Sequence, residues 1–492
     1  MQVPRSSPLT RLLTAVGLMS VLSGCVDHSP FASSSVSPSV DALMDLPTGV
    51  SDQPAVERWW ELYQDPLLNS WVTQALAHNQ DLAQADANVR AMLAGIGEFD
   101  ARRWPSTVMS FAATYGKSAD DQTLAEATDS DAPSQWEFNP GIELAYQVDI
   151  WGQVRNAIER ARVQAEATRE AMELVRLQVV TQTTRAYVDQ CVYGVRIKEA
   201  RRSLQTLERS VQLSDRQRQA GLATELDGVR LLGLREQVKA QLPMLEARRR
   251  MAQYELSMLS GQEPAALVAK ADACQHIPTL KAPLPSGDSW HLLERRPDVR
   301  KAERELQAAA LEVDIVKADL YPKVSFGASL TSSDHHLSNL GDSRSVMFGI
   351  GPLISWEFPN IQANRARLSK ARALQQAQVA HYRAVALTAL KDVRQALARF
   401  DGERQRAQAL GAALAHSQRG FDLAQYNYRA GTVDALQMLD AERDLISVRA
   451  RHVEAQGRLA GAQINLFRAL GGRWQPSSAS GTGHENNTGM QP

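Results

Sequence analysis

The sequence predicts a mostly α-helical protein with membrane β-strands, organised as two copies of one structural unit. Three observations support this fold class. Corresponding motifs recur about 210 residues apart, the stretch from Gln153 to Arg218 lacks proline, and short segments alternate strictly between apolar and polar residues. The composition agrees with long helices, because Ala, Leu, Gln and Arg dominate long stretches while aromatic residues make up only 6% of the 492 residues.

Net charge and hydropathy exclude two classes of protein. The 54 Lys and Arg residues nearly balance the 55 Asp and Glu residues, so the chain has no electrostatic case for a nucleic-acid partner. A mean hydropathy of -0.31 excludes a membrane protein built from many spanning helices. A β-barrel stays compatible with this value, because barrel strands alternate and raise the mean hydropathy little.

The N-terminal segment is predicted to be a targeting signal. Arg5 and Arg11 precede an apolar run, 12–22, that is too short to span a bilayer, which takes about 20 helical residues. The run ends in Leu-Ser-Gly-Cys25, which is similar to the lipobox of bacterial lipoproteins, where the cysteine carries acyl chains. We therefore expect a covalent lipid at Cys25; the alternative is an ordinary signal peptide with an incidental cysteine. Val26 follows, whereas an Asp there would resemble an inner-membrane retention signal, so outer-membrane delivery is expected.

Equivalent motifs show that the chain is a duplication. Before the strands, Asp81 matches Asp298 and Pro105 matches Pro322, in both cases 217 residues apart. After the long helices, Gly221 matches Gly431, 210 residues apart. Such a period indicates a duplicated half-protein, since solenoid repeats have periods of about 20 to 50 residues. The smaller later offset implies extra residues in the first half, and the polar segment 117–137 is predicted to be this insertion, as a loop.

Each half is predicted to contain a helix, a β-hairpin, a very long helix, a turn and another long helix, in this order. Ile142 and its apolar partners alternate with polar or small residues up to position 150, and the segment from Val324 to Ile350 behaves in the same way around a polar loop, 332–345. Alternating runs of about 10 residues fit transmembrane strands or a soluble sandwich hairpin equally well. In a transmembrane barrel the polar side chains face the lumen. These would be Glu143, Gln147 and Asp149.

The long helices favour the membrane alternative. The helix predicted from Gln153 is about 99 Å long and carries a heptad-like, alanine-rich seam from Val154 to Ala186, and a second seam runs from Val379 to Phe400. Such a helix must pair sideways with others. Four strands cannot close a barrel, and lipid forbids open sheet edges, because each unpaired backbone group costs several kcal/mol there. A cyclic homotrimer would share one barrel of twelve strands and close a helical barrel beneath it.

Three further motifs accompany this pattern. They are Trp59-Trp60…Tyr63…Asp65-Pro66-Leu67, the run Leu292-Leu293-Glu294-Arg295-Arg296-Pro297-Asp298-Val299-Arg300, and Ala469-Leu470-Gly471-Gly472-Arg473-Trp474. With Ala430-Gly431 they resemble the TolC-type outer-membrane efflux family, in particular the NodT-like lipoprotein branch that serves resistance–nodulation–division (RND) pumps. The resemblance covers about 59–474. It implies a trimer with an outer-membrane β-barrel of twelve strands, a periplasmic α-helical barrel and an equatorial domain.

The resemblance also implies the function and the partners. The chain is expected to be a passive exit duct for drugs or other toxic small molecules, with no enzymatic activity. Its cargo would come from an inner-membrane pump, of the RND type, through a periplasmic adaptor (membrane fusion protein). No cofactor is expected besides the lipid at Cys25. Two alternatives stay open: an exit channel for type I protein secretion, and a periplasmic coiled-coil lipoprotein without a pore.

A gate is implied at the periplasmic tip, after the turn at Gly431. Residues that match Leu436 and Asp440 form successive rings around the axis in this family, and Arg443 matches a nearby basic partner. Three leucines in a narrow ring exclude water, and three carboxylates make a charged constriction. By spacing alone, Asp440 and Arg443 form an ordinary surface pair. The first-repeat counterparts are Leu226 and Arg230.

No metal site is predicted, because the sequence has no CxxC motif or His/Cys cluster, and the pair His335-His336 lies in a polar loop. Cys191 and Cys274 could form a disulfide in an oxidising compartment. We instead expect Cys191, within a helical stretch, to be a buried free thiol. The predicted organisation is a signal peptide at 1–24, an acylated linker at 25–58, a first repeat at 59–275 (hairpin 106–150, long helices 153–260), a linker at 276–289, a second repeat at 290–474 (hairpin 323–358, long helices 360–470) and a disordered tail at 475–492.

Overall fold

The structure is a computed structural model that describes residues 50–51, 58–221, 223–263, 274, 276–280, 284–285, 295–359 and 361–471. The predicted signal peptide, Cys25 and the tail 475–492 lie outside these residues, as do most positions of the two predicted linkers.

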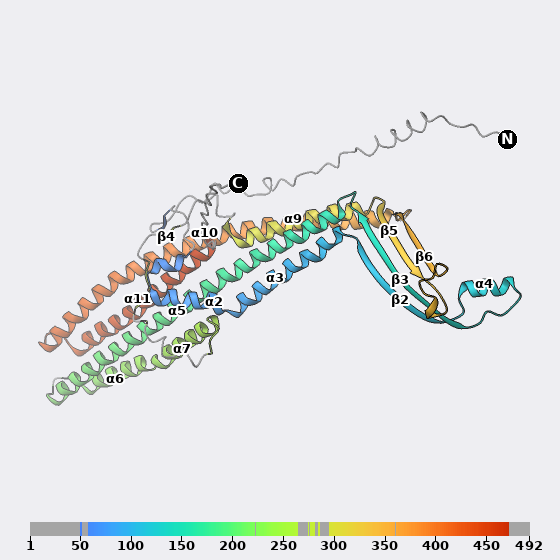
Figure 1. Ribbon diagram of the computed structural model, residues 1–492. Coiled ribbons are helices and arrows are strands. Elements are labelled where there is room, and N and C mark those ends of the chain that lie inside the picture. The colour runs from blue at the N-terminus through green and yellow to red at the C-terminus, as the bar shows by residue number, and fades with distance from the viewer. Residues whose placement is uncertain are drawn as a thin grey trace, which may run out of the picture. The chain divides into compact units, whose positions relative to one another are not determined.

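Both halves of the chain contain a helix, two strands, a long helix and a returning helical segment, in this order (Figure 1). The first half contains η2 (Trp59–Tyr63), α2 (Pro66–His78), α3 (Gln80–Asp100), η3 (Ala101–Arg103), β2 (Ser106–Gly116), α4 (Ala119–Ala127), β3 (Gln135–Val148), α5 (Gln153–Gln219), α6 (Glu225–Lys239) and α7 (Leu242–Leu259). The second half contains α9 (Pro297–Ala318), β5 (Lys323–Ser332), η7 (Leu337–Asn339), β6 (Val346–Ser355), α10 (Ile361–Arg429) and α11 (Ala435–Ala469). A short parallel pair joins β1 (Val50–Ser51) to β4 (Leu284–Pro285).

The four long strands form one antiparallel sheet in the order β2-β3-β5-β6. Ala145 lies opposite Ser106 on one side and Gly327 on the other, so the two predicted hairpins are joined edge to edge through β3 and β5. β2 and β6 are the outer strands, and among the described strands each pairs with a single neighbour.

The prediction of a loop at 117–137 was wrong. Strand pairing continues to Gly116 opposite Gln135, and helix α4 lies in the connection between the two strands, beyond the end of the sheet (Figure 1). Ser118 caps this helix by accepting a hydrogen bond from the backbone N–H of Asp121 at 3.1 Å, and Asp120 and Asp121 lie in its first turn, where the helix dipole favours negative charge. The polar composition that suggested a loop is therefore the composition of a capped surface helix.

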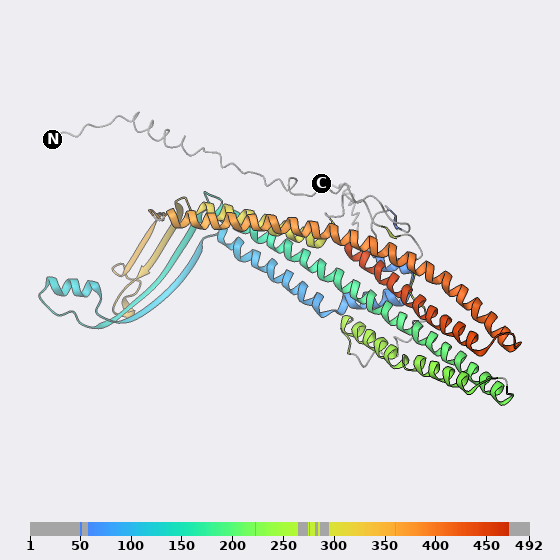
Figure 2. The ribbon, with the colours of Figure 1, turned by 180° about the vertical axis from the view of Figure 1, so that it is seen from behind.

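The long helices α5 and α10 contain 67 and 69 residues, which corresponds to about 100 Å each. Near the sheet the neighbouring helices follow the order α3, α5, α9 and α10, and further away α7 and α6, α5, α11 and α10 lie side by side (Figures 1 and 2). The predicted seams are buried at Ile158, Ala186 and Ala389, among other positions. No helix in the described part of the chain combines the length and the apolar composition that a membrane span requires.

The returning helix of the first half is broken, unlike that of the second half. α6 ends at Lys239 and α7 begins at Leu242, whereas α11 runs through 35 residues without interruption. Pro243 explains the break, because proline has no backbone N–H and its ring collides with the carbonyl of the residue four positions before it.

The largest core cluster lies where η2 and α2 cover α5 and α11. The Trp59 ring stacks on Phe467 with centroids 4.6 Å apart, and the hydroxyl of Tyr187 donates a hydrogen bond to Asp65 at 2.8 Å. Asp65 also caps α2 by accepting from the backbone N–H of Leu67. The Trp-Trp…Tyr…Asp-Pro motif is thus the packing surface of the middle region.

Equivalent polar residues tie the helix ends together in both halves. Asn79 precedes α3 and donates a hydrogen bond to the carbonyl of Leu259, at the end of α7, at 3.0 Å. Arg296 precedes α9 and donates to the carbonyl of Ala469, at the end of α11, at 2.8 Å. Each bond satisfies a carbonyl that has no partner within its own helix. The Arg-Pro-Asp motif therefore links the beginning of one helix to the end of another.

The expectation of a free thiol at Cys191 was wrong, because Cys191 and Cys274 form a disulfide with their Cα atoms 5.2 Å apart. Cys274 follows α7 in the chain and is buried against α5, close to Gly194. The bond closes a loop across a sequence separation of 83 residues. In the chain-entropy description, closing such a loop stabilises the fold by about 4.5 kcal/mol. The helical context of Cys191 suggested burial correctly but could not reveal its partner.

Candidate functional site

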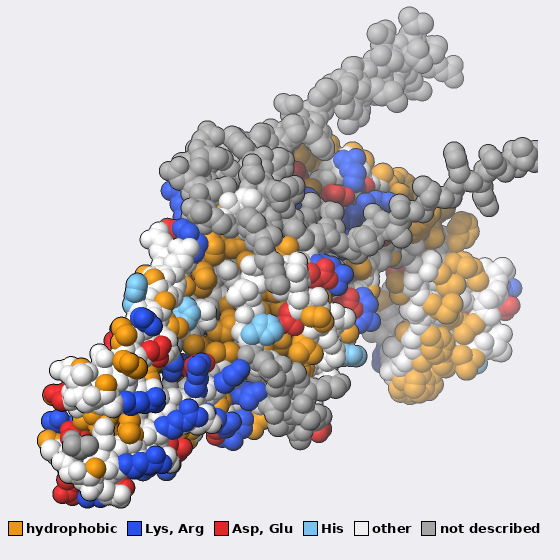
Figure 3. All heavy atoms as spheres, turned by 90° about the vertical axis from the view of Figure 1, so that its left-hand side faces the viewer, with side chains coloured by type: hydrophobic (Ala, Val, Ile, Leu, Met, Phe, Trp, Pro, Cys, Tyr) orange, Lys and Arg blue, Asp and Glu red, His pale blue; other side chains and the backbone are white. Residues whose placement is uncertain are grey.

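One face of the sheet is apolar and exposed. The register places Ile142 opposite Met109 and Leu330, and Leu330 opposite Phe348, so large apolar side chains form continuous rows across the strands. Met109 is 80% exposed and Phe348 is 82% exposed. Figure 3 shows hydrophobic side chains gathered over the sheet, while charged side chains of both signs cover the helical end that faces the viewer. An exposed apolar sheet face of this kind is typical of lipid contact.

Aromatic side chains lie at both ends of the apolar face. At the loop end, Trp136 contacts Tyr115 with ring centroids 5.5 Å apart. At the helical end, Trp151 stacks on Tyr321 with ring centroids 4.5 Å apart. Trp356 is the first residue after β6, which ends at the same edge of the sheet. Transmembrane barrels carry aromatic residues at the two membrane–water interfaces, so these groups mark the expected edges of the lipid-facing band.

On the opposite face, the residues of the two inner strands β3 and β5 are polar or small, while the outer strands add the exposed apolar residues Val108, Met347 and Leu353. Glu143 and Gln147 are exposed on β3 and lie opposite Ser329 and Ser325 of β5. Glu143 and Gln147 thus lie on the same face of β3, as the alternation in the sequence predicted. That this face lines the lumen of a barrel stays a prediction.

Asp149 lies one residue beyond the end of β3, which corrects the predicted extent of the strand, while its assignment to the lumen stays a prediction. β3 ends at Val148, and the Asp149 carboxylate accepts hydrogen bonds from the backbone N–H groups of Val154 at 3.0 Å and Arg155 at 2.8 Å. These donors are among the unsatisfied N–H groups at the beginning of α5, where negative charge is favourable. Asp149 therefore caps the long helix at its junction with the sheet.

The predicted gate residues lie at the end of the helices farthest from the sheet (Figure 1). The turn before α11 contains Gly431, with a φ of +73° that favours glycine, and Asp434 caps the helix by accepting from the N–H of Gln437. Leu436 is 44% exposed, while Met438 and Leu439 on the same helix are buried. Leu436 and Asp440 thus project away from the helices of their own chain.

Asp440 and Arg443 do not form the surface pair that their spacing allows. Within the described residues, neither side chain has an ion-pair partner, and both are exposed. The first-half counterparts Leu226 and Arg230 occupy the corresponding turns of α6, and Leu226 is 55% exposed. The residues of α6 and those of α11 lie at the same end of the molecule, but no hydrogen bond or ion pair joins the two sets within the described part of the chain. Their roles in a gate stay a prediction.

A buried carboxylate next to the gate residues was missed by the sequence reasoning. Glu442 is 1% exposed at the contact of α11 with α5, where it accepts a hydrogen bond from the Ser210 hydroxyl at 3.3 Å. Its second carboxylate oxygen has no partner among the described residues. Burial raises the pKa of Glu442 to about 7, and the bond from Ser210 lowers it only in part. The signal was its position in the buried stripe between Leu439 and Leu445.

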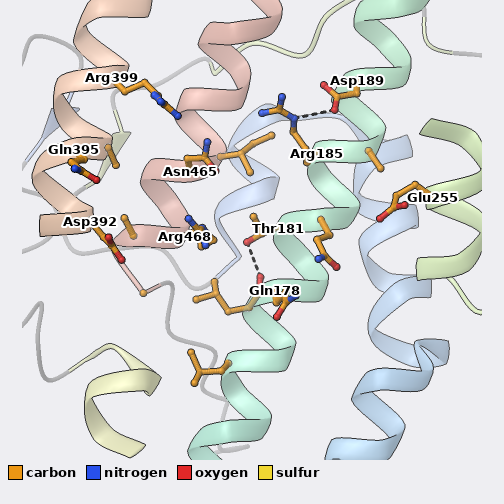
Figure 4. Close-up of a pocket in the computed structure, with 18 of the residues that line it drawn as sticks. Gln178, Thr181, Arg185, Asp189, Glu255, Asp392, Gln395, Arg399, Asn465 and Arg468 are labelled. Carbon is orange, nitrogen blue, oxygen red and sulfur yellow. Dashed lines mark hydrogen bonds and ion pairs between the residues drawn. The ribbon is translucent and has the colours of Figure 1, made fainter. Parts of the chain in front are cut away.

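A cavity of about 1430 Å³ lies among α5, α7, α9, α10 and α11, and it was not predicted either. Figure 4 shows Arg399, Asn465 and Arg468 on the wall formed by α10 and α11, with Gln178, Thr181 and Arg185 of α5 across from them. Its lining therefore combines side chains from both halves of the chain.

Comparisons with known proteins agree with this geometry. The family model described as "Outer membrane efflux protein" matches residues 71–262 and 291–472. SilC of Salmonella typhimurium, a probable outer membrane lipoprotein, is 28% identical over 94% of this chain and 98% of its own length. OpmQ of Pseudomonas aeruginosa, a pyoverdine export outer membrane protein, is 29% identical over 87% of this chain and 90% of its own.

The fold is shared with a solved outer-membrane channel. The structure of OprN superposes with a TM-score of 0.82 and 29% identity, covering 89% of this chain and 99% of OprN. The expected TolC-like fold is confirmed. With two segments of the chain matching the family model, this protein belongs to the outer membrane efflux protein family.

Proposed function

We propose that the chain works as a homotrimer that forms the passive outer-membrane exit duct of a tripartite efflux system. The observation that supports this most strongly is the sheet itself. One of its faces carries rows of exposed large apolar side chains, and the other is polar or small along β3 and β5. Its two outer strands, β2 and β6, each lack a second neighbour among the described strands. Lipid does not tolerate such edges, and pairing of β2 with β6 of the next copy removes all of them once the ring closes.

The duct needs an inner-membrane energy source and an adaptor that spans the periplasm. The family supports an RND-type pump and a membrane fusion protein in these roles, with docking at the tip formed by α5, α6, α10 and α11. Cargo is proposed to be a small molecule, such as a drug or another toxic compound. The name of OpmQ, which assigns pyoverdine export to that relative, supports a small-molecule cargo.

The pore is tested by planar-bilayer recording on the full-length protein purified in detergent. We expect native mass spectrometry to give the mass of three chains, and the same sample to give discrete conductance steps. A stable monomer without conductance would support the coiled-coil lipoprotein without a pore and overturn the proposal. Co-purification with a type I secretion pump in place of an RND pump would instead assign a polypeptide cargo.

Acylation at Cys25 is the proposed anchor, supported by the lipobox-like sequence and by the description of SilC as a lipoprotein. We expect cells fed radiolabelled palmitate to label the wild-type protein, and the label to disappear in Cys25→Ser. Ser23→Ala, a neighbouring change that leaves the thiol in place, serves as the control. Equal labelling of Cys25→Ser would show that Cys25 is not the acylated residue.

A further inference from the structure

The cavity between α5 and α11 contains carboxylates that are mostly neutralised by partners of their own. Arg185 binds Asp189 at 3.0 Å on α5. Arg296 binds Asp298 at 2.6 Å and also approaches Asp392 of α10 at 3.7 Å. These pairs fix three acids to the walls and leave them little net charge for a ligand.

Three arginines of the cavity lining have no such partner among the described residues: Arg248 of α7, the helix that also carries Glu255, and Arg399 and Arg468, which share the wall formed by α10 and α11. Arg399 of α10 and Arg468 of α11 line it, both are exposed, and neither has an ion pair or hydrogen bond from its side chain within the described residues. Gln395 and Asn465 precede them by about one helical turn on the same faces, so two amides stand beside the two guanidinium groups (Figure 4). Glu255, the remaining acid of the lining, comes from α7, on the other side of the cavity in Figure 4.

This wall is chemically complementary to a carboxylate or a similar oxyanion. A guanidinium group offers parallel N–H donors that match the two oxygens of a carboxylate, and the amides of Gln395 and Asn465 add further donors. The rest of the lining is different in character, because Leu174 and Leu177 of α5 and Met251 of α7 present apolar surface to the same space. A ligand that satisfies both parts has an apolar body and an anionic group.

We propose that this cavity is a binding site for amphiphilic organic anions, with the anionic group held by Arg399 and Arg468. The binding of the anion depends only on the folded chain. The further step, that the bound anion is cargo moving through the duct, rests on the proposed function.

The test uses the full-length protein in nanodiscs of a zwitterionic lipid, with titration calorimetry corrected by empty nanodiscs. The probe is 2-naphthoate, and 2-naphthylmethylammonium carries the same apolar body with the opposite charge. We expect saturable binding of the anion, no comparable binding of the cation, and an affinity for the anion lowered roughly tenfold or more in the double variant Arg399→Gln/Arg468→Gln. The double variant Arg383→Gln/Arg419→Gln removes the same charge from α10 outside the cavity, and it should bind like the wild type.

Equal anion affinity in the wild type and in Arg399→Gln/Arg468→Gln would overturn the site, as would equal binding of the cation. Conductance separates this result from a failure of the proposed function. If the wild type and the variant show the same conductance without the probe and also bind the probe equally well, the proposed duct is supported and the anion site is overturned. If neither conducts, the proposed pore falls while the calorimetric comparison still decides the site.

Discussion

The double variant Leu436→Ala/Asp440→Ala is expected to raise the single-channel conductance several-fold. In the proposed trimer these side chains form two successive rings, and their removal widens the constriction and admits water where three leucines excluded it. Both side chains project away from the packed core of their own chain, so the loss of folding stability should stay within about 0.5 kcal/mol. Planar-bilayer recording gives the conductance, and native mass spectrometry checks that the trimer persists.

A matched control is available on α10, where Asp422 and Leu423 are an exposed acid and an exposed leucine outside the predicted gate. Asp422→Ala/Leu423→Ala should leave the conductance unchanged. If Leu436→Ala/Asp440→Ala also conducts like the wild type while remaining trimeric, these residues do not form the gate. The two halves would respond differently in any case, because Arg230 stands where the second half has Asp440.

The substitution Glu442→Gln is expected to remove much of the pH dependence of stability near neutral pH. In the folded chain the pKa of Glu442 is raised to about 7 from its ordinary value of 4.5, so the folded state holds this proton more tightly than the unfolded state does. Stability is therefore complete below about pH 4.5 and falls as the pH rises towards 7. By linkage, the loss amounts to about 3 kcal/mol once the carboxylate is ionised.

Thermal unfolding of the detergent-solubilised protein at pH 5 and pH 8 measures this effect. Glutamine keeps a polar group opposite Ser210 without the buried charge, so Glu442→Gln should unfold at a higher temperature than the wild type at pH 8 and show a smaller difference between the two pH values. Glu208→Gln, at an exposed position of α5, should follow the wild type. An unchanged pH dependence in Glu442→Gln would mean that the titrating group lies elsewhere.

The local periodicities of the sequence predicted the elements well. Alternation around Ile142 placed β3 correctly because a strand turns its side chains to opposite faces at every step. The three-and-four spacing from Val154 to Ala186 predicted α5 because residues at this spacing share one face of a helix. Both patterns are properties of neighbouring residues, and the same neighbours determine the backbone conformation.

The errors arose where composition had to stand in for contacts. Segment 117–137 is rich in polar residues, and only the cap at Ser118 distinguishes its surface helix from a loop. Asp149 continued the strand alternation by one step, but the N–H groups at the beginning of α5 bind its carboxylate and end the strand. The alternation of apolar and polar residues along a strand carries no information about the backbone N–H groups of the helix that follows it.

The sequence by itself determined the duplication, the long helices, the alternating strands and the motifs of an outer membrane efflux protein, because each depends on spacing along the chain. Only the tertiary structure decided the disulfide between Cys191 and Cys274, the buried carboxylate of Glu442 and the arginine wall of the cavity. These depend on which distant side chains meet. Such meetings follow from the packing of α5 against α7 and α11, and no local pattern in the sequence encodes the distance between two helices.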